Sequence, residues 1–460
     1  MKAQFMSSYV MIALALLAGV AQGQDNTPTP SQQASEDTRI VTPAPVNVQA
    51  TSLAYSTETE RSNYLRAGIG FSASYDTNVY SAANGSAVSD ESYSVFPSIA
   101  IAQTTPRLRW DLSYDPGYTF YQNTSALNQS DQRVNGDFSY RLSPHVTLAL
   151  ADNFTRTSNI LNQPTPQAPV SVGGLLESPN PGLVAPIMDM IGNTGSAQIS
   201  YHFSASDITG ASGTFTELRY PNQAEAPGFG GAIGCSSKAT LCALFGASAR
   251  GGEAFYAHRI SRRHYFGATY QYQELLTDPS VNNAKVQSAV LFYTLVPRAN
   301  FSLSFFGGPQ HSDVYGTGIV ERGMWSPEAG AGLGWQGKQT SVSAALTRRI
   351  SDGGGLVGPV TSYSATVGVR HQLTRYLTVG AVGSYADSAV LQTLPSFTNS
   401  GHTISGSISA QRQWGQHFST ELAYMRLRQD YGGVLASVIS PDRNRVWATL
   451  FYHFQRPIGR

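Results

Sequence analysis

Charged side chains alternate with apolar ones along residues 107–115 and 133–141, and these two segments offer the clearest chemistry in the chain. Side chains two residues apart in a strand share a face, so the charged residues of each segment lie on one side. Four arginines interleave with three aspartates, and the field of such a surface partly cancels instead of selecting one sign of ion. Two roles remain open: salt bridges that stabilise a polar wall, or contacts with a polar solute. The residues are Arg107, Arg109, Asp111, Asp115, Arg133, Asp137 and Arg141.

A hydrolytic site is the second chemistry to consider. His311, Asp313 and Asp352 could gather and activate a water molecule, as general bases do. These residue types are common in loops, however. The stretch at 401–406 also lacks the Asn and the spacing of a His-x-Ser-Asn-Gly lipase motif. We therefore expect no catalytic residue and no enzyme.

Cys235 and Cys242 are the only cysteines, and six residues separate them. An even, close pair in an exported chain predicts one disulfide that closes a small loop. No His or Cys array has zinc spacing, and the glycine-rich stretches at 228–234 and 353–358 do not precede helices. We expect no metal and no cofactor. A net charge of +1 gives no support to nucleic-acid binding.

The elements that would position these residues are long strands. Leu108, Trp110, Leu112 and Tyr114 share one face, opposite the charged one. An arginine facing lipid at the bilayer midplane costs roughly 2–4 kcal/mol. Several such charges would exceed the stability of an ordinary domain, roughly 5–15 kcal/mol. The charged faces must therefore point into a lumen, and the apolar faces towards lipid.

Short and long connections alternate along the chain without a skipped step. Reading strands between them predicts an all-β fold: a transmembrane antiparallel up-and-down β-barrel of about 18 strands, with 16 the alternative count. Both termini then lie on the short-turn side, the periplasm. Longer connections are expected near 76–90, 121–130, 157–194, 218–250, 276–283, 308–324, 350–360, 387–400 and 429–442.

The remaining segments complete the domain organisation. Residues 1–23 read as a cleaved signal peptide, with a lysine, an apolar core and small residues before the cleavage site. Residues 24–63 are rich in Pro, Thr, Ser and Gln and predict a disordered periplasmic arm. The barrel is expected over 64–454, followed by a short tail at 455–460. The predicted location is the outer membrane of a Gram-negative cell.

The last apolar face ends in Tyr452 and Phe454. An aromatic end to the final strand resembles the assembly signal of bacterial outer-membrane barrels. The expected partners are accordingly the barrel assembly machinery, outer-membrane lipid and lipopolysaccharide. Polysaccharide or periplasmic export components are further candidates.

One motif near the start of the barrel carries a family resemblance. Tyr75, Asp76, Asn78, Val79 and Tyr80 form a Tyr-Asp-x-Asn-Val-Tyr stretch. It resembles a motif of the outer-membrane barrels associated with exopolysaccharide operons, the EpsL-like and β-barrel porin 2 families. The similarity continues through residues 89–101, 110–114 and 137–144. It implies export or surface handling of an extracellular polysaccharide. The motif's Asp and Asn could equally form a turn through side-chain to backbone hydrogen bonds.

The combined expectation is a porin-like channel for transport, linked to exopolysaccharide export or to passage of hydrophilic solutes. The alternative is a structural or surface-binding barrel whose lumen is blocked by loops. Residues 157–194 and 218–250 are the loops expected to constrict or cap the lumen.

Overall fold

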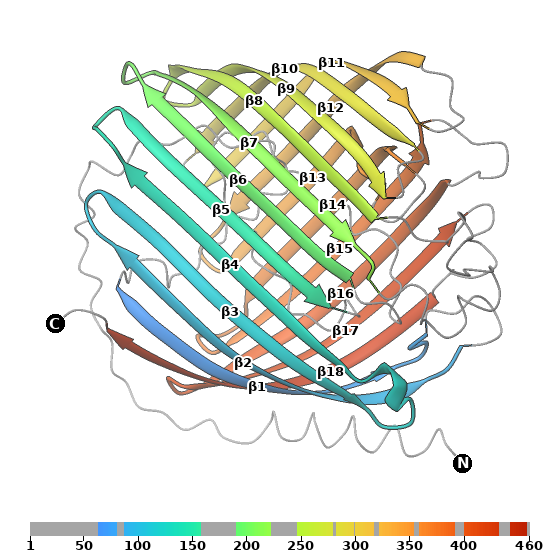
Figure 1. The fold of residues 1–460 in the computed structure, drawn as a ribbon. Helices are drawn as coiled ribbons and strands as arrows, with labels where there is room; N and C mark the ends of the chain where they lie inside the picture. Colours follow the sequence, from blue (N-terminus) through green and yellow to red (C-terminus); the bar gives the residue numbers. More distant parts are fainter. Residues whose placement is uncertain are drawn as a thin grey trace. The chain divides into compact units, whose positions relative to one another are not determined.

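The computed structural model describes residues 63–80, 87–157, 190–221, 246–278, 282–298, 300–316, 322–353, 358–391, 400–431 and 442–457. These residues form long slanting strands that follow one another around a single wall (Figure 1). A single 3₁₀ turn, Ser125–Leu127, is the helical element of the described ranges. Within these ranges no helix is long and apolar enough to cross a membrane.

Eighteen antiparallel strands make up the wall. They are β1 (Tyr64–Asp76), β2 (Asp90–Thr104), β3 (Leu108–Tyr121), β4 (Gln129–Arg141), β5 (Val146–Thr157), β6 (Met190–His202), β7 (Asp207–Arg219), β8 (Gly246–Ser261), β9 (His264–Asp278), β10 (Asn283–Arg298), β11 (Phe301–Tyr315), β12 (Arg322–Gln336), β13 (Thr340–Ser351), β14 (Val360–Gln372), β15 (Leu377–Val390), β16 (Ser400–Trp414), β17 (Phe418–Tyr431) and β18 (Asp442–Pro457).

The sheet closes on itself, because β1 pairs with both β2 and β18. The closing register runs from Tyr64 opposite Pro457 to Asp76 opposite Arg445. Closure removes the free edges and satisfies the backbone of the wall between strands. The predicted fold, an 18-stranded antiparallel barrel, is confirmed.

Alternation along each strand separates two surfaces. Large apolar side chains stay exposed on the outer face, as Leu112, Tyr114, Tyr118 and Phe120 do on β3. The intervening residues of β3 face inward, and Thr119 among them is 1% exposed. An outward apolar belt on a closed barrel is the arrangement that lipid requires. The chain is therefore a transmembrane barrel.

Two predicted boundaries need correction. The longer connection expected near 308–324 is shorter, since β11 continues to Tyr315 and β12 begins at Arg322. Glycines and prolines in these strands suggested a loop, yet Pro309 and Pro327 lie opposite each other within the ladder. The last strand also extends past Phe454 to Pro457 and pairs with β1 throughout. Residues 455–457 thus belong to the barrel and not to a tail.

Candidate functional site

The inner faces of β18, β1, β2, β3 and β4 carry several buried charged side chains. Of the predicted charged residues, Asp111 and Asp115 on β3 share this face with Arg133 and Asp137 on β4, because all follow the inward alternation. Arg109 shares the alternation and is exposed. These residues therefore lie together, as the sequence indicated.

The two charged strands meet in a definite register. Asp115 lies opposite Arg133, an attractive pair. Asp111 lies opposite Asp137, which places two carboxylates side by side. Opposite charges thus face each other across the strands at Asp115 and Arg133, whereas like charges face each other at Asp111 and Asp137. Like charges directly opposite each other destabilise a sheet.

Arg107 and Arg141 lie elsewhere. Arg107 belongs to the turn between β2 and β3, where the Arg141 amide donates to its carbonyl over 2.7 Å. Both side chains are exposed at the short-turn end. The expectation that Arg107 lies on a strand inside the lumen is wrong, because β3 begins only at Leu108.

A buried ion pair that sequence reasoning missed lies at the loop end of the same wall. Arg443 of β18 contacts the carboxylate of Asp76 of β1, and the two side chains are 1% and 6% exposed. Arg445, two residues along β18, donates to Ser74 Oγ over 3.1 Å. The inward alternation of β18 opposite its aromatic outer face could have identified both arginines.

The family-like motif is part of this junction. The Asn78 amide donates to Asp76 Oδ1 over 2.9 Å. The Thr77 amide donates to the Asn444 carbonyl over 3.0 Å, and Asn444 returns a bond to Thr77 Oγ1. Val79 is 1% exposed and packs with Tyr121 and Leu127. Tyr80 packs against this cluster and Tyr75 is exposed on β1. These contacts fasten the first loop to the last strand.

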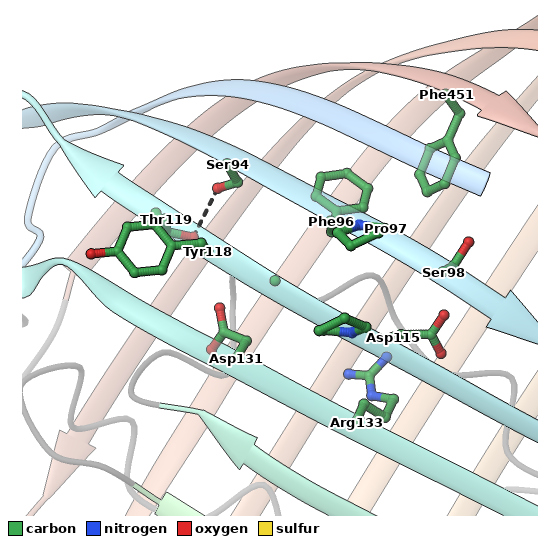
Figure 2. A pocket seen from close by; sticks show the side chains of 12 residues that line it. Ser94, Phe96, Pro97, Ser98, Asp115, Tyr118, Thr119, Asp131, Arg133 and Phe451 are labelled. Carbon is green, nitrogen blue, oxygen red and sulfur yellow. Dashed lines mark hydrogen bonds between the residues drawn. The ribbon is translucent and has the colours of Figure 1, made fainter. Parts of the chain in front are cut away.

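A hollow opens on the inner side of this wall, lined by residues of β2, β3, β4 and β18. Asp115, Asp131 and Arg133 line one side of it (Figure 2). Phe96 and Phe451 line the other side. Charged and aromatic side chains thus meet at one place on the inner surface, as they do in sites that bind small polar molecules.

The aromatic side of the hollow depends on a glycine. Phe96 of β2 lies across β1 at Gly70, where a Cβ atom would come within 2.1 Å of the phenyl ring. The ring therefore reaches Phe451 of β18, with ring centroids 5.0 Å apart and planes inclined by 59°. An inclined pair at this separation is a favourable aromatic geometry.

Two prolines interrupt the ladder behind the hollow. The pairing of β2 with β3 stops at Val95 opposite Tyr118 and resumes at Ile99 opposite Tyr114. Pro97 and Pro116 occupy the centre of this gap, and neither has an N–H to donate. The backbone hydrogen bonds of the β2–β3 ladder are therefore interrupted at the level of the hollow.

The opposite wall is apolar inside. Ile208, Phe255, Val290, Phe292 and Phe306 form a buried inward cluster on β7, β8, β10 and β11. This lining was not expected, because the sequence pattern assigned apolar residues to the lipid face.

The loop end of β13 packs inward over a second apolar cluster. The ladder between β12 and β13 ends at Ala329 opposite Arg348, so Pro327, two residues nearer the start of β12, is not paired with β13. Ile350 is then buried against Val314 and Leu275, and its amide donates to Gln310 Oε1 over 3.2 Å. This end of the β13–β14 hairpin thus lies inside the wall of β9–β11 and narrows the lumen.

Asp352 follows this inward-packed segment. It is 3% exposed, and its Oδ1 has no hydrogen-bond partner among the described residues. Burial raises the pKa of Asp352 to about 6, because desolvation penalises the charged carboxylate. Further along the same connection, a Cβ atom on Gly358 would lie 2.3 Å from Asn282 Nδ2. The connection therefore reaches across to the β9–β10 loop.

The residues considered for hydrolysis do not share one place. His311 and Asp313 lie on the outward alternation of β11, with His311 Nδ1 3.6 Å from Asp313 Oδ2. Asp352 is buried on the inward side. Among the described residues, no group of three or more His, Cys, Asp or Glu side chains could hold a metal ion.

Other predicted features have mixed outcomes. Tyr452 and Phe454 lie on the outer face of β18, opposite Ile69 and Ala67 of β1. Cys235 and Cys242, the signal peptide and the N-terminal arm up to residue 62 lie outside the described residues. Most of loops 157–194 and 218–250 lies outside them too.

Comparisons with known proteins come from structure alone. No protein-family model and no curated protein matches the chain. OccK2 (OpdF) of Pseudomonas aeruginosa is similar with a TM-score of 0.43 and 13% identity, covering 86% of this chain and 100% of that one. OccAB4 of Acinetobacter baumannii gives 0.42 and 9%, covering 87% and 100%. The unliganded ferric citrate transporter FecA gives 0.41 and 8%, covering 85% and 79%. At such low values, the fold assignment rests on this chain's own strand pairing.

Proposed function

We propose that the protein is an outer-membrane channel that conducts hydrophilic solutes. The observation that carries the proposal is a closed 18-stranded barrel with an apolar outer belt and a charged strip on its inner wall. Barrels of this size enclose an aqueous lumen unless loops fill it. The short turns then face the periplasm, and the first and last strands of the barrel begin and end there, which is the usual orientation of such proteins.

Export of an extracellular polysaccharide is the more specific form of this proposal. Its support is the resemblance of the Tyr75–Tyr80 motif to exopolysaccharide-associated barrels. The motif fastens the first loop to β18 and contacts the buried pair with Arg443, so its structural role does not depend on the cargo. Lipopolysaccharide, the assembly machinery and periplasmic export components remain proposed partners.

A blocked structural barrel is the second candidate. The inward-packed end of β13 and the apolar cluster around Ile350 favour it, because both reduce the open lumen. Swelling of liposomes that contain the refolded protein distinguishes the two functions. A channel admits small sugars and excludes large ones with a size cutoff. A barrel that excludes every solute, including the smallest, contradicts the channel.

A further inference from the structure

The hollow between β18 and β4 combines features that suit one kind of solute. Two phenyl rings, Phe96 and Phe451, form an inclined apolar surface with centroids 5.0 Å apart. Beside them lie the carboxylate of Asp115 and the guanidinium of Arg133 (Figure 2). The two surfaces come from β18, β2, β3 and β4 of the closed wall, so their spacing is set by the barrel and not by a loop.

Each carboxylate at the hollow has a cation nearby. Asp115 lies directly opposite Arg133 in the β3–β4 register. Asp131 accepts from Thr157 Oγ1 over 2.5 Å and from Gln129 Nε2 over 3.3 Å, and the charges of Arg133 and Arg445 act on it. A balanced pair offers a strong acceptor and a strong donor without attracting either sign of ion.

Neutral hydroxyl groups complete the lining. Ser94 Oγ and Thr119 Oγ1 lie 2.9 Å apart at the loop side of the hollow. Ser98 lines its other end. Hydroxyls can donate or accept, so they suit a ligand that carries hydroxyls of its own.

We propose that this hollow is a binding subsite for one ring of a neutral, hydroxyl-rich sugar. The apolar C–H face of the ring lies against Phe96 and Phe451, and its hydroxyls bond to Asp115 and Arg133. The assignment deepens the channel function and rests on it. An anionic sugar is disfavoured because two carboxylates line the hollow beside the single guanidinium of Arg133, and an apolar solute would desolvate these charged groups without offering them new hydrogen bonds.

Two measurements on the refolded full chain test the subsite with maltotriose, a neutral glucose trimer. Calorimetric titration in detergent micelles measures the affinity for maltotriose whether or not the protein conducts. Interruptions of the single-channel current in planar bilayers measure binding of maltotriose within the open channel. The variants Phe451→Leu and Phe96→Leu remove an aromatic face and retain apolar volume. Phe71→Leu is the matched control, because Phe71 is exposed on the outer face of β1.

The expected result is maltotriose binding that weakens on the order of tenfold in each inner-face variant and in Asp115→Asn, with Phe71→Leu unchanged. Equal affinity in all variants would overturn the subsite, even if the protein conducts. Tighter binding of a galacturonate trimer or of glycine would overturn the neutral-sugar assignment. Calorimetric binding without any conductance would support the subsite and contradict the channel, so the two failures can be told apart.

Discussion

Arg443 and Asp76 join the last strand of the barrel to the first. Arg443 Nε lies 3.1 Å from Asp76 Oδ2, and Nη2 contacts the same oxygen. The two residues are 367 positions apart in the chain and almost fully buried. The pair therefore fastens the seam of the barrel at its loop end, beside the motif that begins the first loop.

Replacing Arg443 with alanine should strongly destabilise the barrel. The change leaves a buried carboxylate without its cation, which costs about 3–5 kcal/mol. Urea unfolding of the refolded protein measures the loss. Arg426→Ala is the control, because Arg426 and Asp442 form an ion pair whose side chains are 57% and 48% exposed. Such a pair is worth about 0–1 kcal/mol. Equal losses in the two variants would show that the seam pair has no special role.

Gly70→Ala should displace the Phe96 ring. The new methyl group would lie 2.1 Å from the ring, so the ring must leave Phe451. We expect a loss of about 1–3 kcal/mol in unfolding free energy, as for an overpacked site. Gly383→Ala is the matched control, since nothing lies within 4 Å of its Cβ position. If Gly70→Ala is as stable as this control, Phe96 does not occupy the space above Gly70.

Ile350→Ala should loosen the inward-packed end of β13. The substitution opens a cavity against Val314 and Leu275 and costs about 2–5 kcal/mol of packing. Single-channel conductance should rise, because a loosened β13 end would occupy less of the lumen. Leu346 lies on the outer face of the same strand and is 58% exposed, so Leu346→Ala should leave conductance unchanged. Unchanged conductance in both variants would show that this segment does not limit passage through the lumen.

Conductance should also depend on pH through Asp352. Its pKa is raised from 3.8 to about 6 by burial, so the folded arrangement binds the proton more tightly than the unfolded chain does. The stabilising contribution is complete below pH 3.8 and is lost as the pH rises through about 6.

The inward-packed segment should therefore be more stable at pH 5 than at pH 8, and conductance should be lower at pH 5. Asp352→Asn cannot ionise and should lose this dependence. A pH response that persists in the Asn variant would assign the titration to another group.

Much of the barrel follows from local pattern. The period of two identified the strands and placed Asp115 and Arg133 on one inner face, because a strand's side chains alternate wherever it pairs. Alternation places Phe96 and Phe451 on inner faces, but their meeting across Gly70 could not be predicted, since it needs the register of three strands. The apolar inner wall was missed for a related reason. A pattern of alternation does not show which face looks outward when both faces carry apolar residues.

The inward turn of β13 was also beyond pattern reasoning. It depends on Pro327 of β12, near which the ladder to β13 ends, and on Gln310 of β11, which accepts from the freed Ile350 amide. These contacts link residues from three strands. The junction of Asp76 with Arg443 likewise required closure of the barrel before either partner could be assigned.

Single-channel recording of the refolded protein in planar bilayers tests the channel function most directly. A conducting channel should give stable open steps that are ohmic at neutral pH and that maltotriose interrupts. A correctly folded barrel that stays silent at both pH 5 and pH 8 would contradict it and favour the blocked structural barrel.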